Sequence, residues 1–176
     1  MIIGITGPEC GGKDTAAAYL AAKGYSSFSL SDSIRDECDA RGIDKDTPTL
    51  VRVANELRER FGPDILARRA LVKVQPSKNY VANSIRNPAE AAYLREHGNL
   101  LLVLVTADPH IRYARHLARA GRSKYPTFDS FLAAEEEQKS SNPAHQQLHI
   151  VFSMADTTIE NNGQLEQLHA ALDKLP

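Results

Sequence analysis

A glycine-rich segment near the amino terminus places the strongest constraint on the fold of this chain. The segment GPECGGKDT, residues 7–15, follows an apolar run at Ile2–Thr6 and precedes a helical pattern from Gly12 to Lys23. Its spacing of glycine, four residues, glycine and lysine is that of a phosphate-binding loop. In such a loop the backbone N–H groups face one anion, and the helix N-terminus adds partial positive charge. The alternative is a glycine-rich turn that serves packing alone.

Apolar runs alternate with helical patterns along the rest of the chain, which is typical of a parallel sheet covered on both faces. The length of 176 residues suits one compact domain, residues 1–176. We therefore expect an α/β fold of three layers, α/β/α, around a five-stranded parallel sheet. The predicted strands are Ile2–Thr6, Ser27–Leu30, Asn79–Ile85, Leu100–Val105 and Thr157–Glu160.

Two stretches between the predicted strands are longer than one crossover helix requires. Residues 32–74, approximately, carry successive helical patterns and form a predicted helical insert. Residues 121–149, approximately, are polar and suit either a movable lid over a site or an inert surface excursion. The predicted helices are Gly12–Lys23, Asp32–Arg41, Pro48–Phe61, a fourth ending near Lys73, Asp108–Ala120, Phe128–Lys139 and Gln164–Lys174.

Within the loop, Lys13 is placed to neutralise the phosphate oxygens nearest a transferred group. Asp14 stands where Ser or Thr usually follows this lysine, so the hydroxyl that contacts magnesium is displaced to Thr15. Cys10 lies at a helix N-terminus, where a thiol pKa is lowered, or it is simply a small residue. The predicted nucleotide-binding residues are Gly7, Cys10, Gly11, Gly12, Lys13, Asp14, Thr15, Arg115 and Arg119.

The sequence resembles the nucleoside monophosphate kinases, which also carry a non-hydroxyl residue after the lysine and a threonine next. Residues 31–35, SDSIR, are similar to that family's aspartate-x-x-arginine segment, whose arginine holds the acceptor phosphate. Residues 83–87, NSIRN, resemble a segment of dephospho-CoA-kinase-like proteins, and residues 155–163 resemble the closing strand and turn of dephospho-CoA kinase. The resemblance implies a P-loop nucleotide kinase architecture, with acceptor-binding helices in the insert and a lid after them.

Asp32 is the predicted catalytic carboxylate, because the carboxyl end of a parallel strand points into the ligand crevice of such sheets. It would accept a proton from an acceptor hydroxyl or hold a magnesium-bound water. The alternative is that Asp32 only caps the following helix. Arg35, one turn further on, faces the same crevice or solvent. Asn83 stands where the resembled proteins carry aspartate, so the catalytic role falls on Asp32 or activity has been lost.

Arginines supply the remaining candidate phosphate ligands, because the planar guanidinium fits phosphate oxygens. Arg58 and Arg86 are candidates on the acceptor side, with a surface salt bridge as the alternative for each. Four more arginines share one face of the predicted helix at 108–120 and its continuation. In a kinase such residues close over the phosphates. The alternative is a solvent-facing stripe, which is favoured for Arg112 and Arg115. The four arginines are Arg112, Arg115, Arg119 and Arg122.

These residues together predict a kinase that transfers the γ-phosphoryl group of Mg-ATP to a (deoxy)nucleoside monophosphate. Lys13, Asp32 and Arg119 are the predicted catalytic residues, and Thr15 and Asp32 the predicted magnesium ligands. The alternatives are dephospho-CoA as acceptor, a catalytically reduced nucleotide-binding regulatory module, and an NTPase switch without an acceptor. The predicted acceptor-binding residues are Asp32, Arg35, Arg58, Arg86 and Arg122.

Composition and charge limit the classes of partner that this chain is expected to bind. A net charge of -1 argues against duplex nucleic acid as a partner. The longest apolar run, Leu100–Val105, is far short of the ~20 residues that span a bilayer, and the amino terminus lacks the pattern of a signal peptide. Cys10 and Cys38 do not form a disulfide framework. We therefore expect a cytoplasmic monomer or homodimer that binds a small nucleotide acceptor and neither nucleic acid nor membrane.

Overall fold

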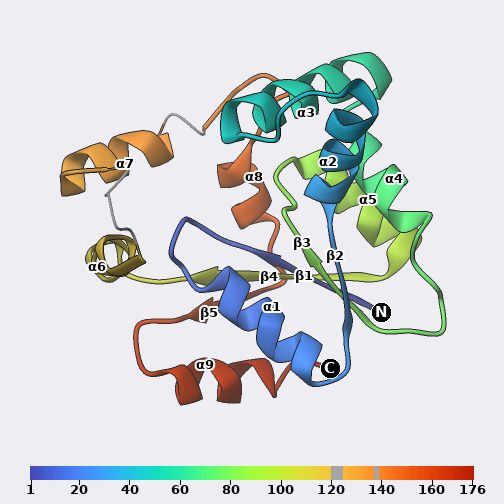
Figure 1. Ribbon diagram of the computed structural model, residues 1–176. Helices are drawn as coiled ribbons and strands as arrows, with labels where there is room; N and C mark the ends of the chain where they lie inside the picture. The colour runs from blue at the N-terminus through green and yellow to red at the C-terminus, as the bar shows by residue number, and fades with distance from the viewer. Residues whose placement is uncertain (120–124, 137–138) are drawn as a thin grey trace.

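The core of the fold is a five-stranded sheet whose strands all run parallel, as predicted, in the order β2-β3-β1-β4-β5 (Figure 1). The computed structural model describes residues 1–119, 125–136 and 139–176. The central strand β1 is buried along its whole length, because it pairs with β3 on one side and β4 on the other. The strands are β1 Ile2–Thr6, β2 Ser26–Ser29, β3 Tyr80–Asn83, β4 Leu100–Thr106 and β5 Thr157–Glu160.

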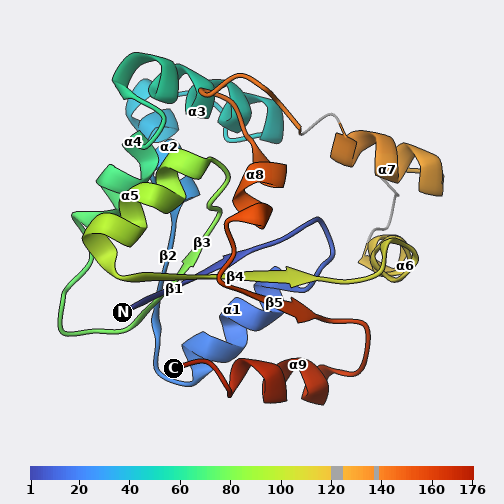
Figure 2. The ribbon, with the colours of Figure 1, turned by 180° about the vertical axis from the view of Figure 1, so that it is seen from behind.

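Helices cover both faces of the sheet, which gives the predicted three layers (Figures 1 and 2). On one face lie α1, Lys13–Ala22, and α9, Leu165–Leu172, which contact each other and the apolar side chains of β1, β4 and β5. The other face carries five helices that share a second apolar cluster with β1, β3 and β4. They are α2 Leu30–Arg41, α3 Thr47–Phe61, α4 Ile65–Leu71, α5 Pro88–Gly98 and α8 Leu148–Ser153.

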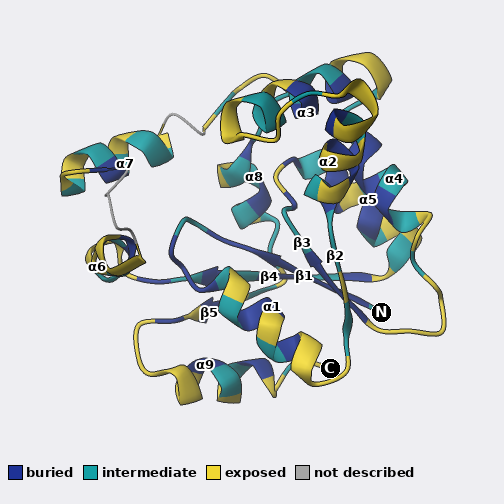
Figure 3. Ribbon diagram, viewed as in Figure 1, coloured by how far each residue is buried: buried dark blue, intermediate teal, exposed yellow. Residues whose placement is uncertain are grey.

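Two further helices lie beyond the carboxyl end of β4, next to the loop that follows β1 (Figure 1). They are α6, Pro109–Arg119, and α7, Phe128–Glu136. Aromatic rings of Tyr113 and His116 on α6 contact those of Phe128 and Phe131 on α7. Most of α7 is only partly buried or exposed, whereas the central strands are fully covered (Figure 3). None of the helices in the described part of the chain is long and apolar enough to cross a bilayer.

Capping residues explain where the structure departs from the predicted helices. The second helix begins at Leu30 rather than Asp32, because Ser29 is its N-cap and Asp32 completes a capping box from the third position. Helix α5 was not among the predicted helices, although Asn87 and Glu90 form a second capping box around Pro88. The predicted lid at 121–149 contains α7 and the first residues of α8, and Val151 of α8 joins the core.

Candidate active site

The loop after β1 has the backbone shape that its glycines permit. Gly7 and Gly12 have φ angles of 147° and 110°, and Cys10 has a φ of 59°. A Cβ at Gly7 would collide with the carbonyl of Val105, and one at Gly12 would collide with the side-chain amide of Asn161. The loop therefore has no room for side chains at these glycines, and its backbone is left to form the cradle. This backbone shape is compatible with a phosphate-binding loop, and the same contacts pack the loop against β4 and the turn after β5.

Lys13 stands at the first position of α1, below this loop. Its ammonium donates a hydrogen bond to the carbonyl oxygen of Pro8 at 2.7 Å. Burial lowers the pKa of the Lys13 ammonium, and the neighbouring Asp14 carboxylate opposes that shift. A partly desolvated cation at the start of a helix is suited to an anion with several oxygens.

Side chains of distant residues hold the loop from outside, among them those of Asn161, Arg115 and Arg112. Asn161, in the turn after β5, donates a hydrogen bond from its buried amide to the carbonyl of Gly11 at 3.0 Å. Arg115 on α6 donates to the carbonyl of Asn161 at 2.8 Å and to that of Cys10 at 3.4 Å. Arg115 was predicted to contact the nucleotide, and the structure shows it contacting the loop backbone. Asn161 was not predicted, although the sequence NNG at 161–163 marked a turn there.

A cleft of about 530 Å³ opens from the loop toward the helical insert. Its far wall is formed by the first turns of α3, the end of β3 and residues 140–148. Ser84, which follows β3, has a φ of 64°, so one residue of the far wall has a left-handed backbone that side chains rarely adopt. The lining residues are Ile5, Thr6, Gly7, Glu9, Lys13, Asp14, Thr47, Val51, Asn55, Asn83, Ser84, Ile85, Arg86, Ser140, His145, Gln146 and Leu148.

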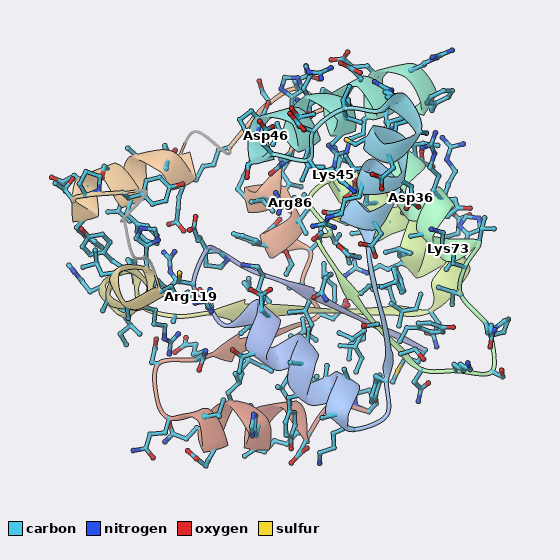
Figure 4. The ribbon with its side chains drawn as sticks, viewed as in Figure 1. Asp36, Lys45, Asp46, Lys73, Arg86 and Arg119 are labelled. Carbon is cyan, nitrogen blue, oxygen red and sulfur yellow. The ribbon has the colours of Figure 1, made fainter. Side chains whose placement is uncertain are left out.

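Arg86, which was predicted to bind the acceptor, lines this cleft. Its side chain is open to solvent and donates one long hydrogen bond, 3.3 Å, to the side-chain oxygen of Gln146. Desolvation by the surrounding protein lowers the pKa of the Arg86 guanidinium, and the nearby Glu90 carboxylate opposes that shift. Figure 4 shows Arg86 between α2 and α8, on the sheet face opposite α1. The structure therefore places this predicted residue at the cleft, across from Lys13.

Arg58 lies behind the cleft rather than in it. Only 2% of the residue is exposed, and its guanidinium forms an ion pair of 2.8 Å with Glu90 on α5. Neither Arg58 nor Glu90 is among the residues that line the cleft. The alternative at this position, a salt bridge, is what the structure shows, although the pair is buried rather than on the surface.

Asp32 and Arg35 are bound to each other on the outer side of α2. One Asp32 oxygen accepts a hydrogen bond from the backbone N–H of Ser29 at 3.0 Å, and the other pairs with Arg35 at 3.2 Å. About half of each side chain is exposed, and neither residue lines the cleft. Asp32 therefore has the capping function that was its alternative role, and its predicted catalytic function stays a prediction.

The arginines of α6 differ in their surroundings. Arg112 is 5% exposed, so the solvent-facing alternative is wrong for this residue. Arg119, near the end of α6, is exposed and lies beside the loop, where its charge acts on Cys10 (Figure 4). Arg122 lies outside the described residues.

The carboxylates that line the cleft next to the loop are those of Glu9 and Asp14. Thr15 lies in the first turn of α1 and is the hydroxyl nearest Lys13 in the chain. A second group of possible metal-ligand atoms comes from Glu9, Cys10 and His116, and these atoms all lie within 4.8 Å of one another. The group is on the side of the loop that faces α6. Burial raises the pKa of the Cys10 thiol despite the opposing charge of Arg119, so the expected lowering is wrong.

A parallel sheet with a phosphate-binding loop after its central strand defines a P-loop NTPase fold, here with a kinase-like arrangement of helices. The AAA domain family matches residues 3–140. A UPF0200 protein of Pyrococcus horikoshii is 30% identical over 183 residues, which cover 99% of this chain and 95% of that protein. One of Thermococcus kodakarensis is 28% identical, over 99% and 96% of the two chains. The chain therefore belongs to the AAA domain family and to the UPF0200 proteins.

Solved structures share the fold. The structure of TT1252 from Thermus thermophilus has a TM-score of 0.59 and 23% identity, over 98% of this chain and 94% of that one. Shikimate kinase from Acinetobacter baumannii, in complex with shikimate, has a TM-score of 0.57 and 16% identity, over 98% and 89%. At these identities the likeness concerns the fold alone. The narrower resemblance to nucleoside monophosphate and dephospho-CoA kinases stays a prediction.

Proposed function

We propose that this protein is an ATP-dependent phosphotransferase that moves the γ-phosphoryl group of Mg-ATP to a (deoxy)nucleoside monophosphate. One observation carries the proposal: the loop cradle with Lys13 opens into a cleft whose far wall presents the guanidinium of Arg86. Two anionic groups bound at these two places would meet between them. Phosphoryl transfer requires mainly positioning and charge neutralisation from the protein, and this cleft offers both.

The residues of the loop are assigned to the donor. The backbone N–H groups of the loop, apart from that of Gly11, which donates to the Pro8 carbonyl, would hold the β- and γ-phosphates together with the Lys13 ammonium, after Lys13 exchanges the Pro8 carbonyl for phosphate oxygen. Thr15 and the cleft carboxylates fit a magnesium ion, which when bound neutralises phosphate charge. Arg119 lies beside the loop and would stabilise the charge that develops on the transferred group.

The acceptor is assigned to Arg86 and the polar side chains around it. An oxygen of the acceptor phosphate would attack the γ-phosphorus while the bond to the β-phosphate oxygen breaks, so the products are ADP and a nucleoside diphosphate. Asp32 would be needed as a base only for an acceptor with a hydroxyl nucleophile, such as dephospho-CoA. To act as a base at the acceptor, Asp32 must give up its exposed ion pair with Arg35. The loss of such a pair costs little free energy in water.

A nucleotide-binding module without turnover is the second candidate. It is favoured by Asn83, a neutral amide at the end of β3 that lines the cleft where the resembled kinases carry a carboxylate. A module of this kind would bind Mg-ATP and form no product with any acceptor.

A coupled ADP-release assay with Mg-ATP and a panel of acceptors distinguishes these functions. The panel contains the ribo- and deoxynucleoside monophosphates and dephospho-CoA, with ATP binding measured separately by calorimetry. We expect product with at least one monophosphate, and its loss in Lys13→Ala with an unchanged circular dichroism spectrum. Lys23→Ala is the matched control, because Lys23 lies at the other end of α1 and pairs with Asp173 on the surface. Unchanged turnover in Lys13→Ala contradicts the proposal, and binding without product supports the module.

A further inference from the structure

The carboxylate of Glu90 joins the acceptor-side loop to the helical insert. Glu90 is fully buried at the start of α5. One of its oxygens accepts hydrogen bonds from Nε and Nη2 of Arg58, at 3.0 and 2.8 Å. The other oxygen accepts from the backbone N–H groups of Arg86 and Asn87, at 2.9 and 3.0 Å. The carboxylate is therefore shared between α3 and the loop that carries Arg86.

The same loop is also held from the opposite side. The carbonyl of Arg86 accepts a hydrogen bond from the backbone N–H of Gln147 at 2.9 Å. The side chain of Asn87 donates to the carbonyls of Pro143 and His145, at 2.6 and 2.9 Å. The backbone on both sides of the Arg86 side chain is thus fixed, while its guanidinium has one long contact to Gln146 at 3.3 Å. The position of this guanidinium in the cleft follows from the loop rather than from its own contacts.

Stability alone is a poor explanation for the buried ion pair. Nη1 of Arg58 is buried without a hydrogen-bond partner in the described part of the chain, which leaves the guanidinium incompletely satisfied. Replacement of a buried ion pair by apolar residues of similar volume is often neutral or stabilising. What apolar residues cannot replace is a carboxylate that accepts hydrogen bonds from two loop amides.

We propose that Glu90 and Arg58 are positioning residues for the acceptor, because they fix the loop that presents Arg86 to the cleft. The inference rests on the proposed function and deepens it: the pair sets the affinity for the anionic group of the acceptor and not the affinity for ATP. Arg58 acts through Glu90, and Glu90 acts through the backbone of Arg86; neither touches the acceptor.

The decisive variant is Arg58→Met combined with Glu90→Met, which removes both charges together. We expect the KM for a monophosphate that the coupled assay identifies as an acceptor to rise about tenfold, equivalent to about 1.4 kcal/mol, while the Kd for ATP changes by less than about twofold. In an Arg86→Met background the same double substitution should cause no further rise, because all three residues act through one guanidinium. A further rise in the acceptor KM in the Arg86→Met background would overturn the proposal. Equal losses of affinity for ATP and for the acceptor would also overturn it.

A second ion pair, which is partly exposed and joins α5 to the residue before β5, controls for loss of stability. Arg95 of α5 pairs with Asp156 at 2.8 Å, and Asp156 also accepts a backbone N–H, that of Leu102, at 2.7 Å. Arg95→Met combined with Asp156→Leu removes the same kind of contact away from the cleft. We expect this variant to change the thermal midpoint and leave the acceptor KM unchanged. A rise in the acceptor KM of the same size here would show that general destabilisation explains both variants.

Hydrogen exchange tests positioning independently of turnover. In the double variant, the amides of Arg86 and Asn87 should lose protection while those of α3 and α5 keep it. If wild-type protein transfers no phosphoryl group, the proposed function fails, and this exchange pattern still decides whether Glu90 orders the loop. Retained protection at both amides contradicts the positioning role. Should the double variant not fold, Glu90→Gln is measured in its place, because its amide cannot accept from both loop N–H groups and Arg58 at once.

Discussion

The guanidinium of Arg112 and the carboxylate of Glu135 form a bidentate ion pair, which joins α6 to α7. Nη2 of Arg112 lies 3.0 Å from one Glu135 oxygen, and Nη1 contacts the other. Nη1 also donates to the carbonyl of Glu9 at 3.2 Å, and Nε donates to that of Ala107 at 3.0 Å. One buried guanidinium therefore connects α7, the end of β4 and the phosphate-binding loop. This connection gives α7 a fixed place beside the loop.

Glu135→Gln should release α7 from α6. Arg112 would be left almost buried with a neutral partner, which we expect to cost about 1–3 kcal/mol in the docking of α7. Hydrogen exchange over residues 128–136 measures this loss, and exchange in the central strands should not change. Glu136→Gln is the control, because Glu136 pairs with Lys139 in an exposed position. Equal exchange in the two variants would contradict the connection.

Asp32→Asn separates the capping function from the proposed catalytic one when it is compared with Ser29→Ala. Both substitutions weaken the capping box of α2, and we expect each to lower the free energy of unfolding by about 0.5–2 kcal/mol. With a hydroxyl acceptor, only Asp32→Asn should lower kcat, by about a hundredfold or more, since general base catalysis contributes that much. Chemical denaturation and steady-state kinetics measure the two quantities. An equal kcat in both variants would leave Asp32 with the capping function alone.

Gly12→Ala should abolish nucleotide binding. The new Cβ would collide with the Asn161 amide, which would either move and release Gly11 or force the loop to shift. Gly24→Ala is the matched control: Gly24 also has a positive φ, 99°, but no described atom lies within 4 Å of the position of its Cβ. The Gly24→Ala variant should lose about 1–2 kcal/mol of stability, because a positive φ is costly for alanine. It should keep its affinity for ATP in calorimetry. Normal ATP affinity in Gly12→Ala would mean that the loop adapts.

Lys13→Met should make the protein more stable at neutral pH. Burial lowers the pKa of Lys13, so a charged ammonium is held at a cost that the unfolded chain does not have. As the pH rises from the lowered folded pKa toward the ordinary value of 10.5, the unfolded state binds more protons than the folded state, and wild-type stability increases relative to the variant. Thermal midpoints of both proteins between neutral and alkaline pH measure the difference. A gap that widens as the pH rises contradicts this account.

Local patterns in the sequence were sufficient for the parts of the site that depend on neighbouring residues. Spacing alone predicted the loop at residues 7–15, because its glycines, its lysine and the helix N-terminus act on adjacent backbone. All five strands were located within a few residues, and β1, β3 and β4 are mainly apolar runs, whereas β2 reads SSFS and β5 reads TTIE. The Asn87–Glu90 capping box is an equally local signal, and it marks the start of α5.

The sequence could not decide what the charged side chains contact. Three arginines carry the same side chain, and no local sequence signal distinguishes Arg58, Arg86 and Arg112. The structure nevertheless buries Arg58 against Glu90, 32 residues away, and Arg112 against Glu135. Only Arg86 of these three lines the cleft. A guanidinium is satisfied by any carboxylate or carbonyl that the fold brings within reach, and periodicity carries no information about which one that is.

What the sequence by itself determined is the phosphate-binding loop, the approximate positions of the five strands and the class of fold that they define. The tertiary structure decided the strand order, the contact of Asn161 with a loop 150 residues earlier, and which of the predicted arginines lines the cleft. The physical reason is range: backbone conformation and the helix N-terminus act over a few residues, whereas ion pairs and buried hydrogen bonds form only after distant segments have packed.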